Sequence, residues 1–140
     1  MDLALFIWHR HLQPAWSPML ASHAANAIQH MHELGMLHRD LKPGNMLIKI
    51  GMPLILKVAD FGMAHHSEED SSKTPGSLVA SSPFRAPEGF RSAMGGGQAY
   101  DKPFDMWALG CVFFEMATFS RFLENKKKTK NKSLQISVCD

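Results

Sequence analysis

Cysteine is scarce in this 140-residue chain, which contains only Cys111 and Cys139. Two isolated cysteines are too few for a disulfide framework or a zinc site, so they indicate thiols in a reducing compartment. Long hydrophobic runs are also missing, and none approaches the ~20 apolar residues that a membrane helix needs. The apolar opening over residues 1–8 has neither a basic leader nor a small-residue cleavage site, so we expect no signal peptide and no membrane partner. These absences favour a soluble intracellular protein, cytoplasmic or nuclear.

Charge is balanced along most of the chain and uneven at one end. The formal net charge is +2, but residues 121–140 hold six Lys or Arg and two acidic residues, which leaves nine basic and eleven acidic residues in 1–120. A solvated, disordered end is the ordinary meaning of such a lysine run, and a nucleic-acid or nuclear-import patch is the alternative. We take 120–140 as a basic low-complexity tail and do not expect nucleic-acid binding.

Helical patterns dominate the first third of the chain. Residues 3–12 are predicted to form a short helix that ends before Pro14. Ser17 and Pro18 then suit the N-cap and the first position of a second helix, and Gly35 suits its left-handed stop. Between them the apolar residues recur at helical spacing: Leu20, Ala24, Ala27, Ile28, Met31 and Leu34. The sequence predicts a buried helix of about 16 residues.

Strand patterns follow that helix. Met46–Ile50 and Leu54–Ala59 are short apolar runs separated by a turn sequence at 51–53, which predicts a hairpin. Residues 63–83 lack periodicity and are rich in polar residues and glycine, so they are predicted to form a long functional or disordered loop. Residues 104–119 form a helix that is too hydrophobic all round to face water.

Three short motifs stand in a fixed order after the predicted second helix. They are His38–Asn45 (HRDLKPGN), Asp60–Gly62 (DFG) and Ala86–Glu88 (APE). A single tripeptide of this kind is common, but the eight-residue stretch is not. Together the three resemble the catalytic loop, the metal-binding loop and the end of the activation segment of eukaryotic protein kinases.

The resemblance implies a role for several polar residues. Phosphoryl transfer needs a proton acceptor, cations and metal ligands more than covalent chemistry. Asp40 is the candidate catalytic base, and Lys42 is expected to reach the transferred phosphate. Asn45 and Asp60 supply hard oxygen ligands that suit Mg²⁺, and Leu47 is expected beneath the adenine of ATP.

The same resemblance places an activation segment before Glu88. The arginine directly before Asp40, Arg39, resembles a feature of the kinase subclass whose activation loop is phosphorylated by an upstream kinase. Its guanidinium could bind the loop phosphate bidentately. Thr74 and Ser77 are the candidate acceptors, with ordinary solvated hydroxyls as the alternative. Ser81, seven residues before Glu88, is where the family has a Ser or Thr that bonds the catalytic Asp and Lys.

Other residues of the motifs indicate the subclass and the support of the site. Lys42 and Pro43 resemble the corresponding residues of serine/threonine kinases. The sequence of residues 84–88 resembles that of cyclin-dependent and related kinases. Pro83 replaces the Trp that is usual there, which leaves the substrate preference open. Three residues are expected to support the site: His38 and Phe61 by stacking, and Asp105 by hydrogen bonds to the catalytic loop.

The family's small lobe has no counterpart in these 140 residues. No Gly-x-Gly-x-x-Gly precedes His38, and the resemblance ends near residue 119, before the arginine that would pair with Glu88. We therefore expect an α+β fold in which 1–119 is the mostly helical large lobe of a protein kinase, incomplete, with a short β-hairpin carrying the catalytic and metal loops. The expected function is ATP-dependent phosphorylation of protein Ser or Thr, with this chain inactive alone.

Two other functions stay open. One is a non-catalytic kinase-like module that binds regulators or substrates of a longer relative, and the other is an unstable truncated product. Metal binding by histidine is not expected, because seven histidines have no spacing that converges with cysteines or carboxylates. They are predicted to lie on helix and loop surfaces: His9, His11, His23, His30, His32, His65 and His66.

Overall fold

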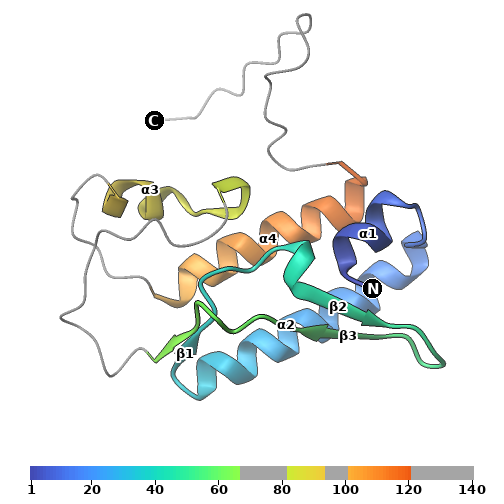
Figure 1. Ribbon diagram of the computed structural model, residues 1–140, viewed down its shortest axis with the longest axis horizontal. Coiled ribbons are helices and arrows are strands. Elements are labelled where there is room, and N and C mark those ends of the chain that lie inside the picture. Colours follow the sequence, from blue (N-terminus) through green and yellow to red (C-terminus); the bar gives the residue numbers. More distant parts are fainter. Residues whose placement is uncertain (67–81, 94–100, 121–140) are drawn as a thin grey trace, which may run out of the picture.

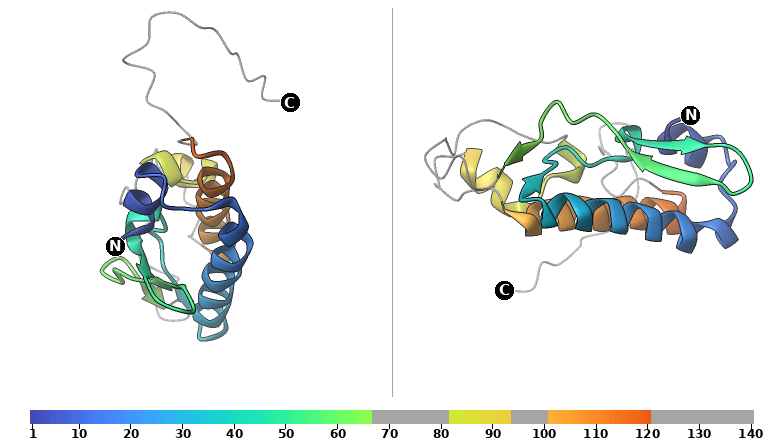
Figure 2. Two further views of the ribbon diagram at one scale, coloured as in Figure 1. Left: turned by 90° about the vertical axis from the view of Figure 1, so that its right-hand side faces the viewer. Right: turned by 90° about the horizontal axis from the view of Figure 1, so that it is seen from below.

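The computed structural model describes residues 1–66, 82–93 and 101–120. Two long helices, α2 (Ser17–Glu33) and α4 (Lys102–Thr118), run side by side, and a hairpin of strands β2 (Met46–Lys49) and β3 (Ile55–Val58) packs against α2 (Figures 1 and 2). The described residues thus combine helices with small sheets, in agreement with the expected α+β class.

Helix α1 (Leu3–Trp8) is shorter than predicted. Asp2 caps it, since its Oδ1 accepts the backbone N–H of Leu5 at 2.8 Å. The expected continuation to residue 12 is wrong because Arg10 has a φ of 56°, which ends the helix. The chain turns back there, and the N–H of Leu12 donates to the carbonyl of Phe6 at 3.1 Å.

The predicted N-cap of α2 is also wrong. A 3₁₀ helix, η1 (Pro14–Trp16), leads directly into α2, so that Ser17 already has helical torsions (φ −55°, ψ −46°) and Trp16 is the cap residue. Within the described residues the buried Ser17 Oγ finds no hydrogen-bond partner. The other end agrees with the sequence, since Gly35 has a left-handed φ of 71°.

The predicted hairpin is present. Strands β2 and β3 are antiparallel, with Met46 opposite Val58 and Lys49 opposite Ile55. A second two-stranded sheet joins β1 (Met36–Leu37) to β4 (His65–His66), so pairing begins inside the segment expected to be a loop. A 3₁₀ helix, η3 (Ser82–Phe84), and helix α3 (Pro87–Ala93) follow, and a further 3₁₀ turn, η2 (Pro43–Asn45), precedes β2.

Helix α4 extends the predicted 104–119 by two residues at its start. Asp101 caps it by accepting the N–H of Lys102 at 2.7 Å, and Phe119 ends it with a φ of 53°. The core between α1, α2, the hairpin and α4 takes the side chains on one side of α4, among them Leu109, Val112 and Met116. The expectation that α4 avoids water on every side is wrong, since Met106 is 53% exposed. In the described stretches of the chain, no helix has the length and apolar character to cross a membrane.

Candidate active site

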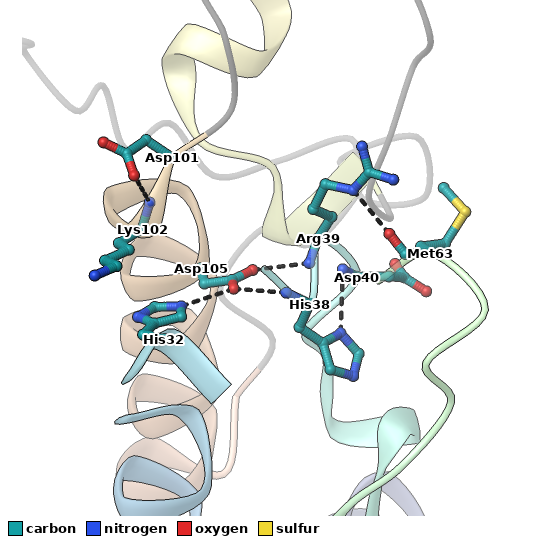
Figure 3. Close-up of polar contacts among 8 residues, drawn as sticks. All are labelled: His32, His38, Arg39, Asp40, Met63, Asp101, Lys102 and Asp105. Carbon is teal, nitrogen blue, oxygen red and sulfur yellow. Dashed lines mark hydrogen bonds and ion pairs between the residues drawn. The ribbon is translucent and has the colours of Figure 1, made fainter. Parts of the chain in front are cut away.

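Asp105 holds the start of the His38–Asn45 motif (Figure 3). Its side chain is buried near the first turns of α4, 1% exposed. Its Oδ2 accepts the backbone N–H of His38 at 2.8 Å, and its Oδ1 accepts the N–H of Arg39 at 2.9 Å. His32, on the last turns of α2, adds a third contact, with its Nε2 2.9 Å from Oδ2. One carboxylate therefore joins α2, α4 and the 38–40 loop.

This loop adopts a conformation that a side chain normally avoids. Arg39 has a φ of 64°, in the left-handed region. A non-glycine residue held there costs of order 1–3 kcal/mol, which the surroundings must offset. The bond from the Arg39 N–H to Asp105 is such a compensation, because a hydrogen bond to a charged acceptor is worth about 1.5–3 kcal/mol.

The His38–Asn45 motif and the DFG motif are joined by several contacts. His38 Nε2 lies 3.1 Å from the carbonyl oxygen of Ala59, and the His38 and Phe61 rings lie 5.4 Å apart in a tilted arrangement. Arg39 Nε donates to the Met63 carbonyl at 2.7 Å. These contacts bring the segment around Asp60 to the loop that carries Asp40.

The same contacts define the protonated nitrogen of His38. A carbonyl oxygen only accepts, so Nε2 donates to Ala59. The N–H of Asp40 approaches Nδ1 at 3.3 Å, which requires a lone pair there. In the neutral ring, these contacts correspond to the tautomer with its proton on Nε2.

Asp40, Lys42 and Asn45 form one cluster. Lys42 Nζ donates to Asp40 Oδ2 at 2.7 Å. Asn45 Nδ2 donates to the same oxygen at 3.1 Å and to the Asp40 carbonyl at 2.9 Å. The Asp40 side chain is fixed by a cation on one side and an amide on the other, and the residue is 9% exposed.

Asp60 and Asn45 carry oxygen atoms of the kind that Mg²⁺ prefers. Asp60 is exposed and has a φ of 62°, and the N–H of Gly62 approaches its Oδ1 at 3.4 Å. Asn45 turns its amide nitrogen to Asp40, so its Oδ1 is the atom left to bind a cation. One carboxylate and one amide oxygen, completed by water and phosphate, are a donor set that Mg²⁺ accepts. Within the described residues there is no group of three or more His, Cys, Asp or Glu side chains that could hold a metal ion.

The remaining candidates lie in different places. Leu47 is on β2 and 45% exposed, and Glu88 is in the first turn of α3. Arg85 lies three residues before Glu88 and is 9% exposed. Its Cζ atom lies over the Phe90 ring, 5.1 Å from the ring centroid. Thr74, Ser77 and Ser81 lie outside the described residues.

The prediction that all seven histidines lie on the surface is wrong for His32. Its side chain is 10% exposed because it reaches Asp105 between α2 and α4. A signal was available in the sequence, since His32 continues the i+4 series of buried residues Ala24 and Ile28. His23 is also partly buried, and its Nδ1 accepts the N–H of Leu56 at 3.4 Å. His65 and His66 are partly buried in the unexpected strand β4, while His9, His11 and His30 are exposed as predicted.

Comparison with known proteins identifies the family. The sequence matches the family model described as protein kinase domain over residues 6–139. It is 41% identical over 111 residues (79% of this chain, 25% of the relative) to serine/threonine-protein kinase ppk23 of Schizosaccharomyces pombe. It is 35% identical over 102 residues (73% and 24%) to GLH-binding kinase 1 of Caenorhabditis elegans, and 37% identical over 89 residues (64% and 19%) to serine/threonine-protein kinase NLK2 of Xenopus laevis.

The chain belongs to the eukaryotic serine/threonine protein kinase family. It spans about a quarter or less of the length of these relatives. Proteins of this family use ATP and Mg²⁺ in general.

Proposed function

We propose that the protein transfers the γ-phosphoryl group of ATP to Ser or Thr hydroxyls of proteins, and that this chain carries the catalytic loop for that reaction within the large lobe. The observation that carries the proposal is the Asp40 carboxylate, held between Lys42 and Asn45 on a loop that Asp105 braces. A positioned carboxylate beside a lysine is what this reaction requires of a protein.

Each residue has a distinct role in the proposed reaction. Asp40 Oδ orients the attacking hydroxyl and accepts its proton, while Lys42 donates to the transferred phosphate. Lys42 Nζ donates to Asp40 Oδ2 at 2.7 Å and so holds this oxygen in place. Asp60 and Asn45 would hold Mg²⁺, which neutralises the phosphate charge when bound. Exposed Leu47 would offer an apolar surface to the adenine.

The finer assignments also belong to this proposal. Arg39 is proposed to bind a phosphate added to Thr74 or Ser77 by an upstream kinase, and Ser81 and Glu88 to complete the activation segment. We propose 120–140 as a basic tail outside a folded kinase region that covers residues 1–119.

We further propose that the 140-residue polypeptide is inactive by itself. Phosphoryl-transfer catalysis is almost entirely positioning and electrostatic stabilisation. None of its ten glycines forms the Gly-x-Gly-x-x-Gly pattern that covers the phosphates in protein kinases. The direct assay uses the purified chain, Mg²⁺, labelled ATP and a generic basic protein substrate. Incorporation that disappears in Asp60→Ala would contradict the proposed inactivity.

A chimera tests the chemistry separately. Residues 36–66 of this chain replace the matching segment of the S. pombe relative, which supplies the rest of a kinase. We expect the chimera to phosphorylate Ser or Thr of the basic protein and Asp40→Asn to lower its kcat by about 10²–10⁴. Lys57→Gln, on the exposed face of β3, is the control for Lys42→Gln and should leave kcat unchanged. An active chimera that is indifferent to Asp40→Asn would refute the assignment of the base.

A further inference from the structure

The tip of the β2–β3 hairpin is apolar and exposed. Residues 50–53 have the sequence Ile-Gly-Met-Pro, and all four are exposed. Ile50 is 68% exposed, and Met52 is completely exposed. Turns normally combine Gly or Pro with Asn, Asp or Ser, whereas this turn presents two large apolar side chains. Such a run of exposed apolar residues is unfavourable in water and indicates a surface that something else covers.

The tip stands out from the rest of the molecule and is held there. It projects at the end where α2 begins (Figures 1 and 2). The strands behind it are anchored, because Ile48 and Leu56 are buried in the core. In addition, His23 Nδ1 on α2 accepts the Leu56 N–H at 3.4 Å. A tip that is already ordered loses little conformational freedom when it meets another surface.

The charges of the hairpin are positive. Lys49 and Lys57 are both exposed, and no acidic residue occurs in 46–59. Lys57 pairs with Leu47, two residues before Lys49, so both lysines stand on the same face of the hairpin. Within the part of the chain that the structure describes, neither lysine enters an ion pair. Two like charges on one face favour an anion that both can approach.

The neighbouring elements do not cancel this charge. Helices α1 and α2, which contact the hairpin, contain one acidic residue, Glu33, at the end of α2 far from the tip (Figure 2). Asp2 and Asp60 lie at the base of the hairpin, beside the first residue pair of β2 and after the end of β3. The Met1 ammonium adds a positive charge at that base, 3.4 Å from the Ile48 carbonyl oxygen. Acidic groups therefore stay away from the tip.

We propose that this tip inserts into the surface of a membrane that contains anionic lipids. Ile50 and Met52 enter the boundary of the acyl chains, while Lys49 and Lys57 meet the anionic headgroups. At ~3.3 Å per strand residue both lysines stand within roughly 17 Å of Met52, and their long side chains extend toward the headgroups. The contact lies in the interface and does not span the bilayer. It departs from the sequence-based expectation of no membrane partner.

The form of the hairpin favours a lipid surface over a protein. The apolar side chains lie at the apex and the cations behind them, which is the order of hydrocarbon and anionic headgroups in a bilayer. A protein partner has to offer a hollow that matches the protruding tip, whereas a bilayer accepts the tip without a matching shape. No residue of the tip is among those proposed to act on ATP or on the protein substrate.

The experiment uses the full chain with the fluorophore NBD attached to Met52→Cys in a Cys139→Ser background, where Cys111 is buried. Vesicles of phosphatidylcholine are added, either alone or with about one third phosphatidylserine. We expect a blue shift and a rise in NBD emission with the anionic vesicles only. NBD on His30→Cys, an exposed position on α2, is the control and should not change.

Unlabelled variants test which residues carry the binding, measured by sedimentation with the anionic vesicles. Ile50→Ser combined with Met52→Ser should weaken binding at least tenfold, because the apolar contact is lost. Lys49→Gln should weaken it about fivefold, the usual effect of one lysine near an anionic surface. Lys102→Gln, exposed at the start of α4, is the matched control and should leave binding unchanged.

Four results would overturn the proposal. They are equal insertion with and without phosphatidylserine, no binding at millimolar lipid, binding that survives the double serine change, and an equal blue shift with polyglutamate. The third would assign the binding to the lysines of residues 121–140, and the fourth would identify an acidic protein as the partner.

Discussion

Asp105 Oδ2 accepts the backbone N–H of His38 across 67 residues of sequence, at 2.8 Å and out of contact with water. The same carboxylate also bonds the Arg39 N–H and His32. Breaking such a network leaves buried donors without acceptors, which costs more than the bonds themselves contribute. The stability of the described fold therefore depends strongly on this one side chain.

Asp105→Asn should lower the free energy of unfolding by about 2–4 kcal/mol, because the new amide turns an N–H₂ toward a backbone donor. Chemical denaturation followed by circular dichroism measures the change. Asp101→Asn is the matched control, since Asn caps a helix as well as Asp does and the residue is exposed. Equal losses in the two variants would contradict the special position of Asp105.

His32 and His30 offer a second comparison on the same helix. His32→Ala should cost about 1–3 kcal/mol, because it removes a polar partner from the buried Asp105. His30→Ala should change stability by less than about 0.5 kcal/mol, as exposed substitutions usually do. Combining His32→Ala with Asp105→Asn should cost less than the sum of the two single changes, because they share one contact. Strict additivity would mean that the His32–Asp105 bond is not formed in solution.

The sequence alone predicted the elements that rest on local patterns. Helix α2 follows from its apolar spacing and from Gly35, and the hairpin from two apolar runs around a turn. Errors arose where a single residue departs from the local pattern. Arg10 ends α1 with a left-handed φ, and Ser17 loses the cap because η1 runs into α2. Neither event leaves a sign in composition or periodicity.

The candidate site was only partly predictable, and for a different reason. The residues Asp40, Lys42 and Asn45 lie within one short motif, so their proximity follows from sequence. The left-handed Arg39 and the role of His32 depend on Asp105, which is far along the chain. Tertiary hydrogen bonds of this kind have no local signature, and here the resemblance to kinases supplied the expectation for Asp105 but not for His32.

Two glycines should respond oppositely to alanine. Gly35 has a φ of 71°, and a Cβ there would lie 3.0 Å from His66 Cε1 in the neighbouring strand β4. Gly35→Ala should therefore lower stability by about 1–2 kcal/mol. Gly110 lies inside α4, and an added Cβ meets nothing within 4 Å. Gly110→Ala should raise stability by about 0.5–1 kcal/mol through helix propensity. Thermal unfolding of both variants measures this, and a loss of stability in Gly110→Ala would show that this face of α4 is covered in solution.

Cys111 provides a pH-dependent measurement. Burial, and then the nearby Glu115 carboxylate, raise the pKa of its thiol from 9.0 to about 11. Between pH 9 and pH 11 the Cys111 thiol therefore keeps its proton in the folded chain and loses it in the unfolded chain. The contribution of this thiol to stability is complete below pH 9 and is lost as the pH rises toward 11. Because the thiolate is the reactive form, iodoacetamide should label Cys111 slowly at pH 8 and increasingly faster up to about pH 11. Mass spectrometry of the Cys139→Ser chain follows the labelling, with the same chain in urea as the unfolded control. Labelling at pH 8 as fast as in urea would contradict the buried position of Cys111 in α4.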